Sequence, residues 1–118
     1  MDAQKKNQLI TGGINVDAAL ARFMGNEAML LKYLNRFLSE KSYAALAEAI
    51  KANDESAAQA AAHTLKSVCG TIGCEKMQSL VVAQEAAMRS GDWQKAVEMM
   101  PEVEAEYNTV CANLKTSL

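Results

Sequence analysis

The sequence is poor in the residues that end helices and in those that favour strands. Among its 118 residues there is one proline, and aromatic residues make up 5% of the chain. Runs of β-branched residues are few, whereas Ala, Leu, Met, Glu, Lys and Gln are abundant, and these residues favour helices. The composition therefore predicts an all-α protein, long enough for one domain with a hydrophobic core and too short for two.

The chain also lacks the charge and the long apolar runs that several classes of protein need. A net charge of −2 without a basic run gives no electrostatic footprint for nucleic acid or for an anionic membrane. No stretch approaches the roughly 20 apolar residues that span a bilayer, and residues 1–14 lack the apolar core of a secretory signal. We therefore expect a soluble cytoplasmic protein with no nucleic-acid or membrane partner.

Cysteine is scarce, and its number is odd. A cytoplasmic chain of this size does not need disulfides, so Cys69, Cys74 and Cys111 are interpreted as reduced structural thiols. A metal site that joins them to the only histidine, His63, is the alternative. We reject it because the Cys-x4-Cys spacing fits no zinc pattern and Cys69 belongs to the apolar side of its helix, away from His63. No metal is expected.

Hydrophobic periodicity predicts a series of amphipathic helices. Gly12 and Gly13 separate a flexible segment, residues 1–12, from the folded domain, residues 13–118. No turn signal is strong enough to split the helix predicted over residues 26–52. Pro101 either kinks the last helix or begins another after a short break, and the unbroken hydrophobic phase favours nearly collinear segments. Capping residues included, the predicted helices cover 16–24, 26–52, 54–72, 75–90 and 92–118.

Short connections between these helices make consecutive ones antiparallel neighbours. The predicted fold is therefore an up-and-down antiparallel four-helix bundle with an additional short N-terminal helix.

His63 lies on the polar side of its helix. At about 100° per residue it is about 160° away from Leu65, which belongs to the apolar stripe. No side chain on its own side is large and apolar, so this face is open. The residues that share it are Gln59, Ala60, Lys66, Ser67 and Gly70.

Such a face suits a carrier of chemical groups. A neutral imidazole is a nitrogen nucleophile at cellular pH, and Lys66, one turn later, can offset the negative charge of a phosphoryl group on the ring. The small residues Ser67 and Gly70 leave room for another protein. A nucleophilic enzyme would need a pocket, which a flat helix face does not supply. By position alone, however, an exposed histidine on a helix is more often a solvated side chain than a functional residue.

The segment H-T-L-K-S-V-C-G-T-I-G, residues 63–73, resembles the signature of histidine-containing phosphotransfer (HPt) domains. That signature runs H-x-L-K-G and continues with small residues, an aliphatic residue and glycine. The resemblance extends to residues 13–27, similar to the family's N-terminal segment, and to residues 85–92, similar to the end of its next helix. It covers residues from about 12 to 118. The matching signature residues are His63, Leu65, Lys66, Ile72 and Gly73.

The resemblance implies a four-helix bundle whose exposed histidine takes a phosphoryl group from an aspartate of one receiver domain and passes it to another. His63 would accept the phosphoryl group, Lys66 would stabilise it, and the open face would dock the partner. No kinase activity and no cofactor are implied, since Mg²⁺ belongs to the partner receiver domain. The implied partners are response-regulator receiver domains and a hybrid histidine kinase, and the protein is expected to be a monomer.

The sequence departs from the family pattern at two positions. Ser67 replaces the usual glycine after the lysine, and Gln84 replaces an aliphatic residue. A polar side chain on the following helix can orient the histidine ring, and Glu85 is the first candidate for this role, ahead of Gln84. Two alternatives remain open: a helical adaptor or dimerisation module with an incidental His63, and a degenerate HPt domain that transfers slowly because of Ser67.

Overall fold

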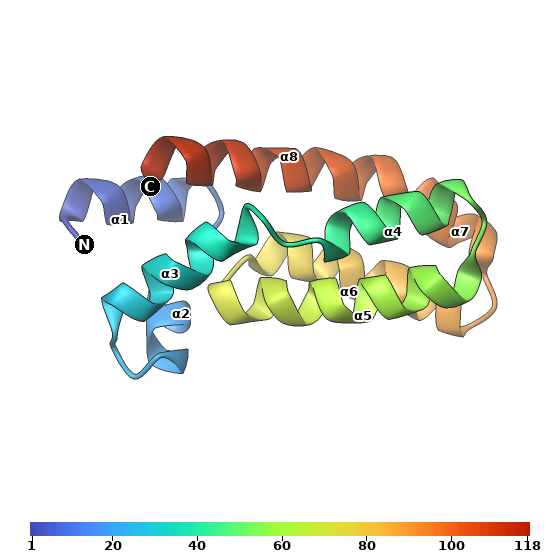
Figure 1. Cartoon of the computed structure of the whole chain (residues 1–118), viewed down its shortest axis with the longest axis horizontal. Coiled ribbons are helices and arrows are strands. Elements are labelled where there is room, and N and C mark those ends of the chain that lie inside the picture. The colour runs from blue at the N-terminus through green and yellow to red at the C-terminus, as the bar shows by residue number, and fades with distance from the viewer.

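The computed structural model describes residues 1–118 as helices joined by short connections, without strands (Figure 1). The all-α prediction is confirmed. The helices are α1 (Ala3–Thr11), α2 (Val16–Arg22), α3 (Glu27–Phe37), α4 (Ser42–Lys51), α5 (Glu55–Ile72), α6 (Glu75–Arg89), α7 (Trp93–Glu98) and α8 (Met100–Ser117).

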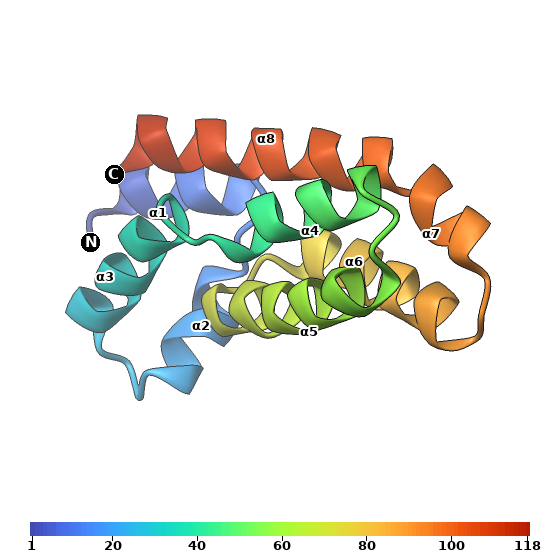
Figure 2. The same cartoon turned by 45° about the vertical axis from the view of Figure 1, so that its right-hand side comes forward.

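The later helices form the up-and-down bundle that the sequence predicts. Helix α5 packs between α4 and α6, and α8 closes the bundle against α4 and α6. Consecutive long helices run antiparallel, and α5 lies along the edge of the molecule opposite α8 (Figures 1 and 2). One side of α5 is therefore left uncovered, and this is the side that carries His63.

The predicted helix over residues 26–52 is interrupted, so that prediction is wrong. Helix α3 ends at Phe37 and α4 begins at Ser42. The Glu40 carboxylate accepts hydrogen bonds from the backbone amides of Lys41 and Ser42, at 3.0 and 3.2 Å. The Glu40 side chain thereby satisfies backbone amides at the start of α4. These hydrogen bonds between side chain and backbone compete with the continuation of α3.

Pro101 lies in the first turn of α8, where a missing amide proton removes no hydrogen bond. Met99 alone separates α7 from α8, and α7 bends away from the axis of α8 (Figure 2). The sequence allowed either one kinked helix or a separate helix after a short break. The structure has a separate helix, α8, after the break. The two segments are not collinear.

The N-terminal segment is helical rather than flexible, which corrects the expectation for residues 1–12. The Asp2 side chain caps α1 by accepting from the Lys5 amide at 2.7 Å. Leu9 is fully buried, and α1 packs against α8 and α2. The burial of Leu9 against the fold outweighs the polar character of its neighbours, so the folded unit includes α1 as well as residues 13–118.

The interior is a single hydrophobic core, to which every helix contributes. Cys69 and Cys74 are buried free thiols, and Cys111 is half-buried. Burial raises the pKa of the Cys69 thiol to about 12, so that this thiol is not the reactive thiolate at cellular pH. No group of three or more His, Cys, Asp and Glu side chains is placed to hold a metal. None of the helices combines the length and the apolarity needed to cross a membrane.

Candidate functional site

Helix α5 is fixed at both ends, which holds His63 in place. At the start, the Asp54 side chain accepts from the Ala57 amide at 3.1 Å. At the end, Gly73 adopts a left-handed conformation with φ +80°, and an added Cβ would lie 2.7 Å from the Asn15 carbonyl oxygen. Only glycine meets both conditions. The end of α5 is thus tied to the segment that precedes α2.

His63 projects from the uncovered side of α5, as its helical phase predicts. Its side chain is 58% exposed, and its Nδ1 lies 3.3 Å from Oε2 of Glu85 on α6. No protein group hydrogen-bonds to Nε2. The ring therefore has one nitrogen directed at a carboxylate and the other open to solvent, an arrangement that orients the imidazole.

Glu85 connects three basic groups. Its side chain is only 3% exposed, and its oxygens lie 2.5 Å from Lys66 Nζ and 3.2 Å from Arg89 Nη2, in addition to the His63 contact. Burial favours the neutral acid, but the hydrogen bond and charge of Lys66, with the charges of Arg89 and His63, lower the pKa of Glu85 below its ordinary value. The carboxylate is therefore ionised at cellular pH.

Arg89 was not singled out by the sequence analysis. It lies four residues after Glu85 on α6, so both side chains share one face of that helix. If Glu85 contacts His63, a cation four residues after Glu85 on the same helix face is expected near the imidazole as well. This spacing could have identified Arg89 from the sequence. The site therefore contains two cations, Lys66 on α5 and Arg89 on α6.

A shallow groove runs between α5 and α6 beside the imidazole. Gln59 and Ala60, both expected on the docking face, line it together with His63, as do Glu85 and Arg89. The groove is open, and most of the side chains that line it are polar. It is too shallow to enclose a small molecule. It suits contact with another macromolecule better than capture of a free substrate.

Ser67 is exposed one turn after His63, on the same face. Its hydroxyl donates to the His63 carbonyl oxygen at 3.2 Å. The hydroxyl is thus directed back along the helix backbone, a common arrangement for serine in helices.

Two of the predicted site residues lie elsewhere. Gly70 is buried beneath the Gln78 side chain of α6, and an added Cβ would lie 2.5 Å from Gln78 Nε2. It therefore serves the close packing of α5 on α6 and does not belong to an open docking face. Gln84 is also buried, and its Nε2 donates to the Ala96 carbonyl oxygen at 3.0 Å, on the side away from His63. Of the two ring-orienting candidates, only Glu85 contacts the histidine.

Comparison with known proteins places this arrangement in a family. The sequence model of the Hpt domain matches residues 33–113, which is more than half of the chain and includes His63, Lys66, Glu85 and Arg89. No curated protein and no solved structure matches the chain. Members of this family are phosphocarrier modules of two-component signalling and are not kinases. The exposed histidine on a helical bundle and the family match agree, and the chain belongs to the Hpt domain family.

Proposed function

We propose that this chain is a phosphorelay carrier, which accepts a phosphoryl group on His63 from a receiver-domain aspartate and passes it to a second receiver domain. The observation that carries the proposal is the exposed imidazole whose Nδ1 lies 3.3 Å from the buried carboxylate of Glu85. An incidental surface histidine does not require such a partner. The alternative of a helical adaptor with an incidental His63 has no comparable observation in its favour.

Nε2 is the proposed acceptor atom. With the Nδ1 proton directed at Glu85, the lone pair of Nε2 points to solvent. This lone pair attacks the phosphorus, the bond between phosphorus and the aspartyl oxygen breaks, and the aspartate leaves as a carboxylate. The ring keeps its Nδ1 proton and becomes cationic, so the Glu85 carboxylate stabilises the phosphorylated state. Transfer to the next aspartate reverses these steps.

Lys66 and Arg89 are the proposed phosphoryl-stabilising groups. Together with Glu85 they give the site a net positive charge when His63 is neutral, counting two cations against one carboxylate. A phosphoryl group adds about two negative charges, which these cations can offset while they remain near Glu85. Both side chains retain some exposure, and this leaves them free to turn toward the phosphoryl oxygens.

The partner supplies the remaining chemistry. The open groove beside His63 excludes no water by itself, so the receiver domain must cover the site and bring the aspartate, and Mg²⁺ belongs to that domain. Because a carrier must leave one receiver before it meets the next, the interface is expected to be modest in area and short-lived. A monomer suits this role, since it leaves the α5 face free.

Phosphoryl transfer is tested with the purified chain and a receiver domain that has been phosphorylated beforehand. We expect label to move to the chain and to be acid-labile and alkali-stable, as a phosphohistidine is. Because His63 is the only histidine, this lability assigns the label to one residue.

His63→Gln is the matched variant, since it keeps a polar side chain of similar size on the exposed face. It is expected to remain folded and to take up no label. Absence of label on the unmodified chain, or label that persists in His63→Gln, contradicts the proposed function.

A further inference from the structure

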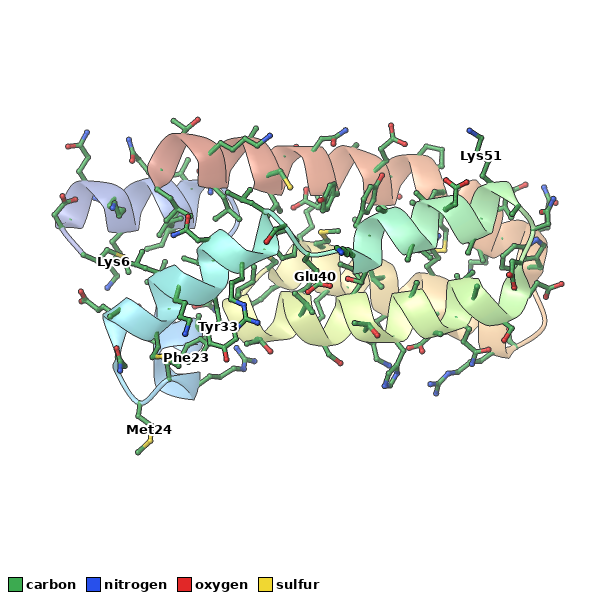
Figure 3. All side chains as sticks on the ribbon, in the orientation of Figure 1. Lys6, Phe23, Met24, Tyr33, Glu40 and Lys51 are labelled. Carbon is green, nitrogen blue, oxygen red and sulfur yellow. The ribbon has the colours of Figure 1, made fainter.

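The break between α7 and α8 leaves a buried carbonyl group without its helical partner. In a continuous helix the Ala96 carbonyl oxygen would accept from the Met100 amide, four residues later. Helix α7 ends at Glu98, and the Met100 amide does not donate to Ala96. Ala96 is fully buried, in an interior packed with side chains (Figure 3). Its carbonyl group therefore needs a donor from elsewhere in the fold.

Gln84 of α6 supplies that donor. Its Nε2 donates to the Ala96 carbonyl oxygen at 3.0 Å and lies 3.5 Å from the Met100 sulfur, and the side chain is fully buried. Its Oε1 has no hydrogen-bond partner in the protein. An unsatisfied buried oxygen costs free energy, which an aliphatic side chain of similar size avoids. The amide is therefore explained by the contact that it makes with α7 rather than by packing.

This contact acts on the rotation of α6 about its axis. Gln84 and Glu85 are consecutive, so their side chains leave the helix about 100° apart, Gln84 toward α7 and Glu85 toward α5. A side chain ends roughly 6 Å from the helix axis, so a rotation of about 20° moves its end by roughly 2 Å. Such a movement is enough to break the 3.3 Å contact between Oε2 of Glu85 and Nδ1 of His63. The place of Glu85 beside the ring therefore depends on what holds α6 from its other side.

We propose that Gln84 is a positioning residue of the phosphorelay site: its bond to Ala96 holds α6 at the rotation in which Glu85 reaches His63. The inference rests on the proposed function and adds to it a residue that touches neither the imidazole nor the phosphoryl group. It also gives a reason for a polar residue where the family pattern has an aliphatic one, because the α7–α8 break leaves a buried carbonyl group to be satisfied.

Nitrogen NMR of the imidazole tests the positioning directly, because His63 is the only histidine and its two ring nitrogens give two signals. In the unmodified chain we expect the proton on Nδ1, which faces Glu85. Gln84→Met keeps the length of the side chain and removes the donor. Its ring signals are expected to move toward those of Glu85→Ala, in which the carboxylate is absent. Signals identical to those of the unmodified chain overturn the inference.

Leu9→Ala is the control for a general loss of stability. Leu9 is as deeply buried as Gln84, and its helix α1 packs mainly on α8 and α2. This variant is expected to unfold at a lower temperature and to keep the ring signals of the unmodified chain. An equal change of the signals in Leu9→Ala would show that they follow stability, and it would overturn the inference as well. If Gln84→Met does not fold, Gln84→Leu takes its place with the same expected result.

Transfer kinetics separate positioning from docking. With a phosphorylated receiver domain, Gln84→Met is expected to lower the maximal rate about ten-fold and to leave the half-saturating concentration unchanged, because the exposed face is not altered. In a Glu85→Ala background the same substitution should have no further effect, since Gln84 acts through Glu85. An unchanged maximal rate, or losses that add in the double variant, overturns the inference. Absence of label on the unmodified chain contradicts the proposed function instead, and the NMR comparison still decides the role of Gln84.

Discussion

At the scale of single residues, the candidate site is organised around a buried acid, Glu85. The Glu85 carboxylate lies within 3.3 Å of a nitrogen of His63, Lys66 and Arg89, while its own side chain is almost completely buried. A buried charge is tolerated only with such partners. The same contacts that stabilise Glu85 therefore orient the imidazole and gather the cations around it.

Glu85→Gln tests this arrangement through the pH dependence of stability. The pKa of Glu85 is lowered in the folded state, so its contribution to stability is present above the ordinary carboxylate pKa and is lost as the pH falls through the folded value. We expect the unmodified chain to lose stability on acidification below about pH 5. The Glu85→Gln variant should lose less over the same range.

Urea unfolding of both proteins at neutral and acidic pH measures the difference. Glu98→Gln is a suitable control, because Glu98 is exposed and forms no ion pair. An equal loss of stability in Glu85→Gln and the unmodified chain would rule out the stabilising role of the carboxylate.

At the scale of elements, α5 shows what local signals can and cannot predict. Its cap at Asp54, its apolar stripe and its end at Gly73 are all readable from the residues, and each is present in the structure. The break at Glu40 and the helix α1 were not predicted. The periodicity predicted a continuous helix through Glu40, but the side chain of Glu40 bonds to the backbone and a new helix begins there. The polar residues 1–12 predicted a flexible segment, but the burial of Leu9 holds them as a helix.

Gly73→Ala and Gly91→Ala form a matched pair that tests how α5 is anchored. Both glycines are left-handed, with φ of +80° and +82°, but an added Cβ at Gly73 would lie 2.7 Å from the Asn15 carbonyl oxygen, whereas nothing lies within 4 Å of one at Gly91. We expect Gly91→Ala to lower the free energy of unfolding by about 1 kcal/mol, which is the cost of the backbone conformation alone.

Gly73→Ala should cost clearly more, because the backbone before α2 must also move. Chemical denaturation of the two variants gives the comparison. Equal losses of stability would show that the contact with Asn15 does not restrain the end of α5.

At the scale of the whole molecule, the four-helix bundle leaves one side of α5 uncovered, and the additional helices α1 and α2 lie toward one end of the bundle. Helix α1 runs beside the C-terminal part of α8, and α2 and α3 lie near the C-terminal end of α5 (Figure 1). The face of α5 that carries His63 therefore stays open, and the side chain of His63 is 58% exposed.

Leu9→Ala tests whether α1 belongs to the fold. Leu9 is fully buried, and removal of a buried leucine side chain costs about 2–5 kcal/mol. Ile10, its neighbour, is 47% exposed, so Ile10→Ala should change stability far less. Thermal unfolding compares the two variants, and a flexible segment at residues 1–12 would instead leave both at the stability of the unmodified chain.

The sequence by itself determined the helical fold, the exposure of His63 opposite the apolar stripe and the place of Lys66 nearly one turn later on the same helix. These properties depend on the order of residues along one helix, which the 3.6-residue period makes readable. The tertiary structure decided that Glu85 reaches His63, that Arg89 joins the site, that Gly70 is covered and that Gln84 faces inward. Each of these depends on how closely α6 approaches α5 and with what rotation, and that is set by the packing of whole faces rather than by the period of either helix.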